Sequence, residues 1–240
     1  VMLAAIAHWG LEAALSRFVG MFAFALWDRR DKALHLARDR FGEKPLYYGR
    51  MGNTFLFGSE LKALQQHPAW RGEVDRGALA LYMRHNYIPA PYSIYKGVCK
   101  LPPGTFLTLD AESWGEGVPH PYWSARKMME TGAAHPFAGT ESEAVASLDT
   151  LLRATVLGQM AADVPLGAFL SGGVDSSLVV ALMQAQSSRP VKTFTIGFSE
   201  AQYNEAEQAK AVARHLGTQH TELYVTPSDA RRSRSPREGP

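Results

Sequence analysis

A short polar segment, Ser171-Gly172-Gly173-Val174-Asp175-Ser176-Ser177, contains the residue types that hold a phosphate chain. Its two glycines allow a sharp turn that exposes backbone N–H groups, and its three serines add hydroxyl donors, which predicts an anion-binding nest. The carboxylate of Asp175 would be repelled by phosphate unless a cation lay between them, which indicates Mg²⁺. The segment has no Gly-Lys-Ser/Thr sequence, so it is not the P-loop of kinases and GTPases. The alternative is a plain strand-to-helix turn with a capping serine; Asp175 favours the anion site.

Apolar runs on both sides of this loop predict the elements that position it. Val164–Leu170 is expected to be a strand that enters the turn, and a buried helix is expected to leave it over Ser176–Gln186. This helix would direct its positive end at the loop. A helix over Glu141–Ala161 is expected to precede the strand.

The chain after the loop repeats the same alternation. A second strand is expected over Val191–Phe198 and a third over His220–Val225, with a helix between them that Asn204 caps and Gly217 ends. This β-α-β-α-β order predicts a parallel, doubly wound sheet. Ligands of such sheets bind at the carboxyl ends of the strands, where the loop lies.

The second strand ends on Ile196-Gly197, at the same edge as the loop. Gly197 would allow a flat ring to approach the backbone, with Ile196 packing on the face of that ring. The alternative, which the pattern alone favours, is ordinary sheet core with a glycine at a strand end. Alternation along this strand places Lys192, Phe194, Ile196 and Phe198 on one face.

The first half of the chain is predicted to be mainly antiparallel, because short apolar runs there are joined by short polar turns. The expected strands are 21–27, 33–37, 45–48, 55–57 and 105–109, the first four forming two hairpins. Ser59 is expected to cap a helix that ends at Leu64, and Asp75 a helix that ends near His85.

The composition is typical of a globular protein, with 46% hydrophobic and 20% charged residues among 240. A net charge of +2 is too small to favour nucleic acid or an acidic membrane as a partner. The only cysteine, Cys99, excludes an internal disulfide and a thiolate zinc site, and it fits a reducing, cytoplasmic location. The longest apolar run, Met21–Trp27, is far shorter than a membrane span.

Both ends of the sequence are unusual. Val1 already lies inside an amphipathic, helix-like stretch, and residues 231–240 are rich in Arg, Ser and Pro. Residues 227–240 are therefore expected to be a disordered or out-of-frame tail, in preference to an arginine-rich arm for nucleic acid or phosphorylation.

Six segments resemble the glutamine-hydrolysing asparagine synthetase family, in collinear order over residues 1 to about 230. They are 20–28 (GMFAFALWD), 38–48 (RDRFGEKPLYY), 59–64 (SELKAL), 87–91 (YIPAP), 100–104 (KLPPG) and 164–177 (VPLGAFLSGGVDSS). The resemblance implies α/β and α+β architecture in two domains. Residues 1–125 would be the C-terminal part of a glutaminase domain, an N-terminal-nucleophile αββα sandwich. Residues 126–140 would be a linker, and 141–226 the N-terminal part of a doubly wound, ATP-binding synthetase domain.

The resemblance also implies the chemistry. Such enzymes hydrolyse glutamine at an N-terminal cysteine and pass the ammonia through an internal tunnel to the second domain. There ATP and Mg²⁺ convert aspartate into a β-aspartyl-adenylate, and ammonia displaces AMP to give asparagine. The implied partners are therefore the small molecules ATP, aspartate and glutamine-derived ammonia, with a homodimer for the full-length enzyme and neither nucleic acid nor membrane.

Site residues are carried over by position. The residues that would bind pyrophosphate are Ser171, Gly172, Gly173, Asp175 and Ser176. Asp175 would lie on the metal side of this contact. Leu170 and Ile196 match family positions that contact the nucleotide, and Gly197 lies beside them.

The sequence also departs from the family. The nucleophilic cysteine has no counterpart, because Cys99 lies mid-chain and has no free α-amine, so no catalytic residue of the glutaminase is found. A second Ser-Gly-rich, acidic motif is missing too, and the chain is expected to be a fragment, truncated at both ends and inactive by itself. Three alternatives stay open: a β-lactam synthetase or peptide-cyclising relative, an ammonia-dependent or exopolysaccharide-linked amidotransferase, and a non-catalytic pseudoenzyme fragment.

Overall fold

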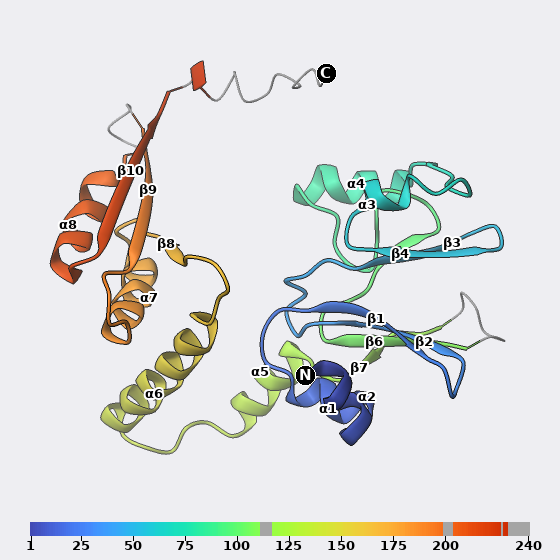
Figure 1. Ribbon diagram of the computed structural model, residues 1–240, viewed down its shortest axis with the longest axis horizontal. Helices are drawn as coiled ribbons and strands as arrows, with labels where there is room; N and C mark the ends of the chain where they lie inside the picture. Colours follow the sequence, from blue (N-terminus) through green and yellow to red (C-terminus); the bar gives the residue numbers. More distant parts are fainter. Residues whose placement is uncertain (111–116, 199–203, 227, 230–240) are drawn as a thin grey trace. The chain divides into compact units, whose positions relative to one another are not determined.

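The structure is a computed structural model that describes residues 1–110, 117–198, 204–226 and 228–229. It divides into two compact units, Val1–Pro136 and Phe137–Pro240, which we describe one at a time (Figure 1). The boundary lies inside the expected linker, 126–140, where helix α5 (Ala125–Ala134) occupies the first part. Of the expected tail, 227–240, only residues 228–229 are described. No helix in the described ranges is long and apolar enough to cross a membrane.

Two antiparallel sheets form the first unit. Their strand orders are β1-β2-β6-β7 and β4-β3-β5. The strands are β1 (Ala23–Asp28), β2 (Ala33–Arg38), β3 (Tyr47–Met51), β4 (Thr54–Gly58), β5 (Val98–Lys100), β6 (Thr105–Leu109) and β7 (His120–Pro121). β1 pairs with β2 and β3 pairs with β4, so both predicted hairpins are confirmed, as is the predicted strand β6.

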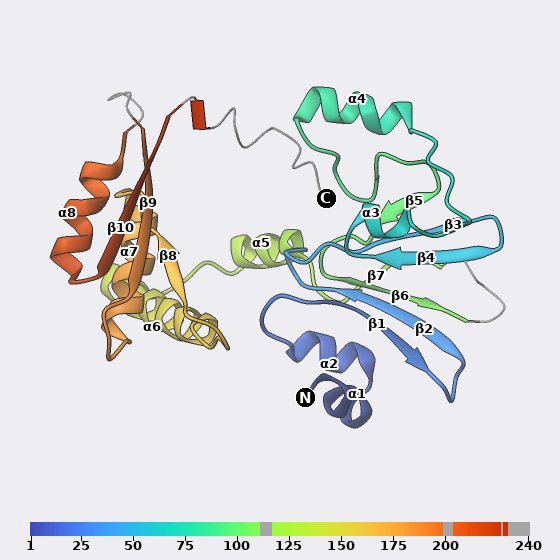
Figure 2. The ribbon, with the colours of Figure 1, turned by 45° about the horizontal axis from the view of Figure 1, so that its top comes forward.

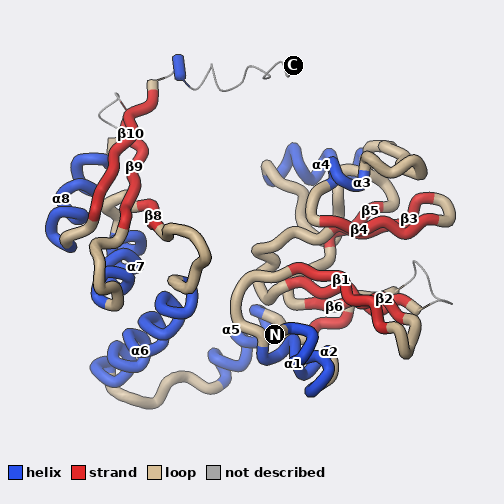
Figure 3. Tube along the Cα trace, in the orientation of Figure 1, coloured by secondary structure: helices blue, strands red, loops and turns tan. Residues whose placement is uncertain are grey.

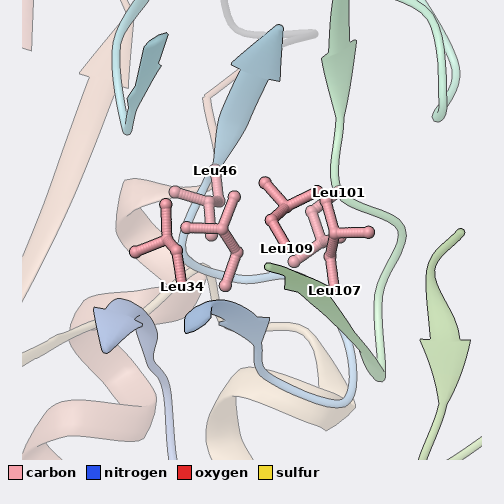
Figure 4. Close-up of a cluster of buried hydrophobic side chains, with 6 residues drawn as sticks. Leu34, Leu46, Leu101, Leu107 and Leu109 are labelled. Atoms are coloured by element: carbon pink, nitrogen blue, oxygen red, sulfur yellow. The ribbon is translucent and has the colours of Figure 1, made fainter. Parts of the chain in front are cut away.

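A cluster of leucines fills the space between these two sheets. β2 and β6 of the first sheet contribute four of them, and the other two adjoin β3 and β5 of the second sheet (Figure 4). The six buried residues are Leu34, Leu36, Leu46, Leu101, Leu107 and Leu109. Each leucine removed from water contributes about 1.5–3 kcal/mol, so this cluster holds the two sheets of the first unit together.

Helices cover the outer faces of the two sheets (Figure 2). α1 (Met2–Trp9) and α2 (Leu11–Arg17) lie on the outer side of the first sheet, and α3 (Leu61–Leu64) packs against β4 of the second; α4 (Arg76–His85) lies further out on that side. The predicted cap of α4 is confirmed, because Asp75 accepts hydrogen bonds from the N–H groups of Gly77 and Ala78. The predicted cap of α3 is wrong. Glu60, whose side chain makes no capping bond, occupies the cap position in place of Ser59.

One buried carboxylate organises the turn between β2 and β3. Asp39 is 1% exposed and accepts hydrogen bonds from four backbone N–H groups. The donors are Phe22, Phe41, Glu43 and Lys44, at 2.9–3.3 Å. Burial by itself would raise the pKa of Asp39, but the backbone donors outweigh it and hold that pKa below its ordinary value. The conformation of 38–45 therefore depends on an ionised Asp39.

The second unit alternates helix and strand along the chain (Figure 3). Its elements are α6 (Glu141–Gln159), β8 (Gly167–Phe169), α7 (Val174–Ala185), β9 (Lys192–Phe198), α8 (Ala206–Leu216) and β10 (Gln219–Val225). The three strands are parallel in the order β10-β9-β8, so the predicted parallel sheet is confirmed. β8 is shorter than the predicted strand 164–170. Pro165 has no N–H to donate, and the pairing with β9 begins only at Gly167 and Lys192.

Both crossover helices pack on one face of this sheet. Val180 of α7 and Ala209 and Ala213 of α8 form one buried cluster with Leu170. Right-handed crossovers that all progress in one direction, β8 to β9 to β10, place their helices on the same side. The three described strands are therefore wound in one direction, as in one half of a doubly wound sheet, and they do not include the reversal of strand order that defines such a sheet. Lys192, Phe194, Ile196 and Phe198 share the opposite face, as predicted.

The start of α8 also differs from the prediction. Glu205 occupies the cap position and makes no side-chain cap bond. Asn204 accepts a hydrogen bond from the Ala206 N–H at 3.2 Å. In the predicted capping box the donor would be the N–H of Glu207, one residue further along the chain. The predicted buried stripe of α8 and its end at Gly217, in the left-handed conformation, are both confirmed.

Candidate functional site

The serine loop, which we define as Ser171–Ser177, lies at the carboxyl end of β8. β8 ends at Phe169, Leu170 follows, and α7 begins at Val174 with Gly173 as its cap residue. No side chain caps this helix, so the capping serine that belonged to the alternative of a plain turn is not found. The first backbone N–H groups of α7 have no acceptor within the helix and point toward the loop.

The hydroxyl groups of two serines hold the loop in shape. Ser176 Oγ accepts from the Ser171 N–H at 3.3 Å and lies 3.0 Å from Ser171 Oγ. Ser171 Oγ in turn accepts from the Gly173 N–H at 3.3 Å, and the Ser176 hydroxyl donates to the Gly173 carbonyl at 3.2 Å. The loop is thus preorganised before any anion arrives. The third predicted donor, Ser177, is different. Its hydroxyl is enclosed without a hydrogen-bond partner among the described residues and does not face the solvent side of the loop.

Gly172 brings the loop close to α8. Its φ of +80° lies in the left-handed region, and a Cβ at this position would lie 2.8 Å from Gln208 Cβ and 2.9 Å from Ala209 N. Both distances are shorter than any ordinary contact, so only glycine fits here. The close approach places the first turn of α8 directly beside the serine loop.

An open cavity of about 300 Å³ adjoins the loop at the carboxyl ends of β8 and β9. Four of the residues expected from the sequence line it: Leu170, Ser171, Ser176 and Ile196. The sequence did not single out the other four lining residues, which are Phe169, Phe194, Thr195 and Glu205. Among the lining residues that the structure describes, Glu205 carries the only ionisable side chain. A signal for it existed, since Glu205 opens the helix after the second strand, at the strand edge where ligands of parallel sheets bind.

Leu170 contributes to the cavity through its backbone, because its side chain points into the core. Its side chain is 1% exposed and belongs to the core cluster with Val180. Its N–H donates to the Phe194 carbonyl at 2.9 Å, and its carbonyl accepts a hydrogen bond from the Thr195 hydroxyl. These bonds fasten the carboxyl end of β8 to β9, which fixes the floor of the cavity.

Gly197 does not line the cavity, and the flat ring that approaches it is the protein's own. A Cβ on Gly197 would lie 2.6 Å from Tyr224 Cε1, so the ring of Tyr224 fills that space. The Tyr224 hydroxyl donates to Glu222 at 3.0 Å, and Glu222 pairs with Lys210 of α8 at 3.2 Å. The bond to Lys210 lowers the pKa of Glu222, and the bond to Glu222 raises that of Tyr224. This chain of contacts holds the aromatic ring over Gly197.

The carboxylate of Asp175 lies in the first turn of α7 and is exposed. Within the described residues it has no hydrogen-bond or ion-pair partner, and no group of three or more His, Cys, Asp or Glu side chains is gathered anywhere. A cation at Asp175 would therefore need oxygen ligands from a bound phosphate and water, which is the usual coordination of Mg²⁺.

Cys99 has the properties of a structural residue. It lies in β5 opposite Tyr48, and burial raises the pKa of its thiol. A thiol held protonated is a weak nucleophile, which agrees with the sequence-based exclusion of Cys99 from that role.

Two family models match the chain. Residues 1–123 match the model described as a glutamine amidotransferase domain, and residues 147–235 match the model described as asparagine synthase. One match falls within each compact unit. The second match extends beyond residue 226, where the expected synthetase segment ends.

Curated relatives match most of this chain. It is 34% identical over 232 residues to glutamine-hydrolyzing asparagine synthetase 1 of Bacillus subtilis, covering 95% of this chain and 34% of the relative. It is also 34% identical over 226 residues to a homologue of such synthetases in Methanocaldococcus jannaschii, covering 90% of this chain and 41% of the relative. It is 32% identical over 197 residues to asparagine synthetase 3 of Bacillus subtilis, covering 79% of this chain and 30% of the relative. The chain thus spans between 30% and 41% of the length of these relatives.

Proposed function

Since the chain belongs to the family of glutamine-hydrolysing asparagine synthetases, we propose that the protein makes asparagine from aspartate, ATP and the nitrogen of glutamine. In this proposal the second unit binds ATP and activates the β-carboxylate of aspartate as an acyl-adenylate, with release of pyrophosphate. Adenylation converts a poor leaving group into a good one, so that ammonia displaces AMP. This reaction is proposed for the full-length enzyme. This chain spans about a third of the length of the relative that it matches.

One observation carries the ATP part of the proposal. The serine loop, the N-terminus of α7 and the 300 Å³ cavity adjoin one another at the carboxyl edge of a parallel sheet. The pyrophosphate moiety would be bound by Ser171, Gly172, Gly173 and Ser176 through backbone N–H and hydroxyl groups. The base would contact the side chain of Ile196 and the backbone of Leu170. Gly197 would support this contact indirectly, because its lack of a side chain leaves room for the Tyr224 ring to pack against the end of β9.

Asp175 would hold Mg²⁺ against the phosphate oxygens. Its exposed carboxylate at the helix N-terminus, which has no partner among the described residues, fits this task, because the ion needs an oxygen ligand and tolerates several waters. When bound, the ion would neutralise charge on the departing pyrophosphate. The loop donors would stabilise the same charge from the protein side.

The first unit would be part of the glutaminase domain, of the N-terminal-nucleophile class. Two antiparallel sheets packed face to face, with helices on both outer faces, support this assignment (Figure 2). The match of residues 1–123 to the amidotransferase model supports it independently.

The test is a calorimetric titration of the protein with ATP, with and without Mg²⁺. With Mg²⁺, Asp175→Ala is expected to lower ATP affinity about tenfold or more, since it removes the protein ligand of the ion. In EDTA, Asp175→Ala should bind ATP more tightly than the unmutated protein does, because without the ion the carboxylate only repels the phosphates. Asp149→Ala is the control, a half-exposed aspartate of α6 that pairs with Arg153, and should change neither affinity.

Absence of ATP binding by the unmutated protein would refute the nucleotide part of the proposal. Pyrophosphate exchange into ATP then tests the acceptor. Exchange that requires aspartate supports asparagine synthesis and excludes a non-catalytic fragment, whereas exchange driven by another carboxylic acid favours the β-lactam synthetase type of relative.

A further inference from the structure

Glu205 lines the cavity beside the serine loop, yet the phosphate-binding proposal gives it no task. Its side chain is exposed and finds no hydrogen-bond or ion-pair partner in the part of the chain that the structure describes. An ionised carboxylate is an acceptor only, so in a ligand it must meet a donor or a cation.

The position of Glu205 on α8 is fixed by the packing of the loop. Gly172 lies against Gln208 and Ala209, which are three and four residues further along the same helix. Residues at this spacing share one face of a helix, so Glu205 stands one turn nearer the cavity on the face that meets the loop.

The cavity wall changes character along its length. Ser171 and Ser176 provide polar groups at one end, and the exposed side chains of Phe194 and Ile196 provide an apolar surface on β9. A nucleotide whose phosphates lie on the serines and whose base lies on the apolar surface has its ribose between the two. The ribose hydroxyls are the donors in that middle part of the ligand.

We infer that the Glu205 carboxylate accepts hydrogen bonds from the ribose hydroxyls of the bound nucleotide and selects ribonucleotides over deoxyribonucleotides. This rests on the proposed binding of ATP in the cavity. An acidic residue that follows the second strand of a parallel sheet recognises ribose in the same manner in dinucleotide-binding folds. Here the acid comes from the helix that Gly172 draws against the loop.

The experiment compares the dissociation constants of ATP and 2′-deoxyATP for the unmutated protein, Glu205→Ala and Glu207→Ala. Hydrogen bonds to a charged group are worth about 10- to 100-fold in affinity, so the unmutated protein should prefer ATP by about tenfold or more. Glu205→Ala should bind both nucleotides alike. Glu207→Ala removes the same charge from the same helix turn, at an exposed position outside the cavity lining, and should keep the preference.

The comparison separates this inference from the proposed function. A protein that binds neither nucleotide refutes the proposed function, and the inference with it. A protein that binds ATP but whose preference survives Glu205→Ala overturns only the ribose contact. An equal loss of affinity for both nucleotides overturns it as well, because Glu205 would then act on the phosphates, the base or a cation. Retained binding of 2′-deoxyATP by Glu205→Ala shows that the variant is folded.

Discussion

Replacing Gly172 by alanine tests whether its close approach to α8 shapes the nucleotide site. The left-handed conformation of residue 172 costs a side-chain-bearing residue about 1–2 kcal/mol. The new methyl group would also lie 2.8 Å from Gln208 Cβ and 2.9 Å from Ala209 N. One of these atoms is backbone, so the helix or the loop must shift, which costs about 1–3 kcal/mol more. The total loss of stability is about 2–5 kcal/mol.

Gly217→Ala is the matched control in the same unit. Gly217 has a φ of +71°, but no atom of the described residues lies within 4 Å of the point that an alanine methyl group would occupy, so this variant carries the conformational cost alone. The difference between the two variants isolates the steric term, about 1–3 kcal/mol. In hydrogen exchange this corresponds to roughly 5- to 150-fold faster exchange of amides in Gly172→Ala than in Gly217→Ala.

Hydrogen exchange with mass spectrometry is the suitable assay, because all five tryptophans precede residue 137 and their fluorescence does not report on the second unit. Peptides from β9 and α8 should show the difference, and peptides from β2 and β6 should exchange as in the unmutated protein. ATP affinity should fall in Gly172→Ala and persist in Gly217→Ala. Equal effects of the two substitutions on exchange, or unchanged ATP affinity in Gly172→Ala, would refute the idea that this contact forms the site.

Two further predictions concern the buried carboxylate of Asp39 and the ring that covers Gly197. Asp39→Asn is expected to destabilise the first unit by about 2–4 kcal/mol at pH 7, since an amide accepts fewer of the four backbone bonds and opposes N–H with N–H. Because the folded pKa of Asp39 is lowered, its carboxylate stabilises the fold above the unfolded pKa of about 3.9, and this contribution disappears as the pH falls below that value. The stability gap between the two proteins in urea titrations should therefore narrow from pH 6 to pH 3; a constant gap would contradict this. Gly197→Ala should cost about 1–2 kcal/mol by displacing the Tyr224 ring, and Tyr224→Ala in the same chain should relieve that steric cost. A double variant whose two losses simply add in thermal unfolding would show that the ring is not what Gly197 accommodates.

The sequence predicted the elements that depend on local pattern. Apolar alternation located both hairpins of the first unit and the three parallel strands of the second. Asp75 was recognised as a cap because its carboxylate bonds to N–H groups only two and three residues away. The serine loop was found for the same reason, since its glycines and hydroxyl groups are neighbours in the chain.

The tertiary structure decided what distant residues do together. Local pattern does not say that α8 packs against Gly172, so it gave no role to Glu205, which is far from the loop along the chain. It also placed a possible ligand at Gly197, where the fold puts Tyr224 instead. The single winding direction of the second sheet follows from strand order, which depends on pairing between segments. The sequence alone identified the serine loop, because its glycines and hydroxyl groups are neighbours in the chain. Only the packing of α8 against Gly172 brought Glu205 to the cavity beside that loop.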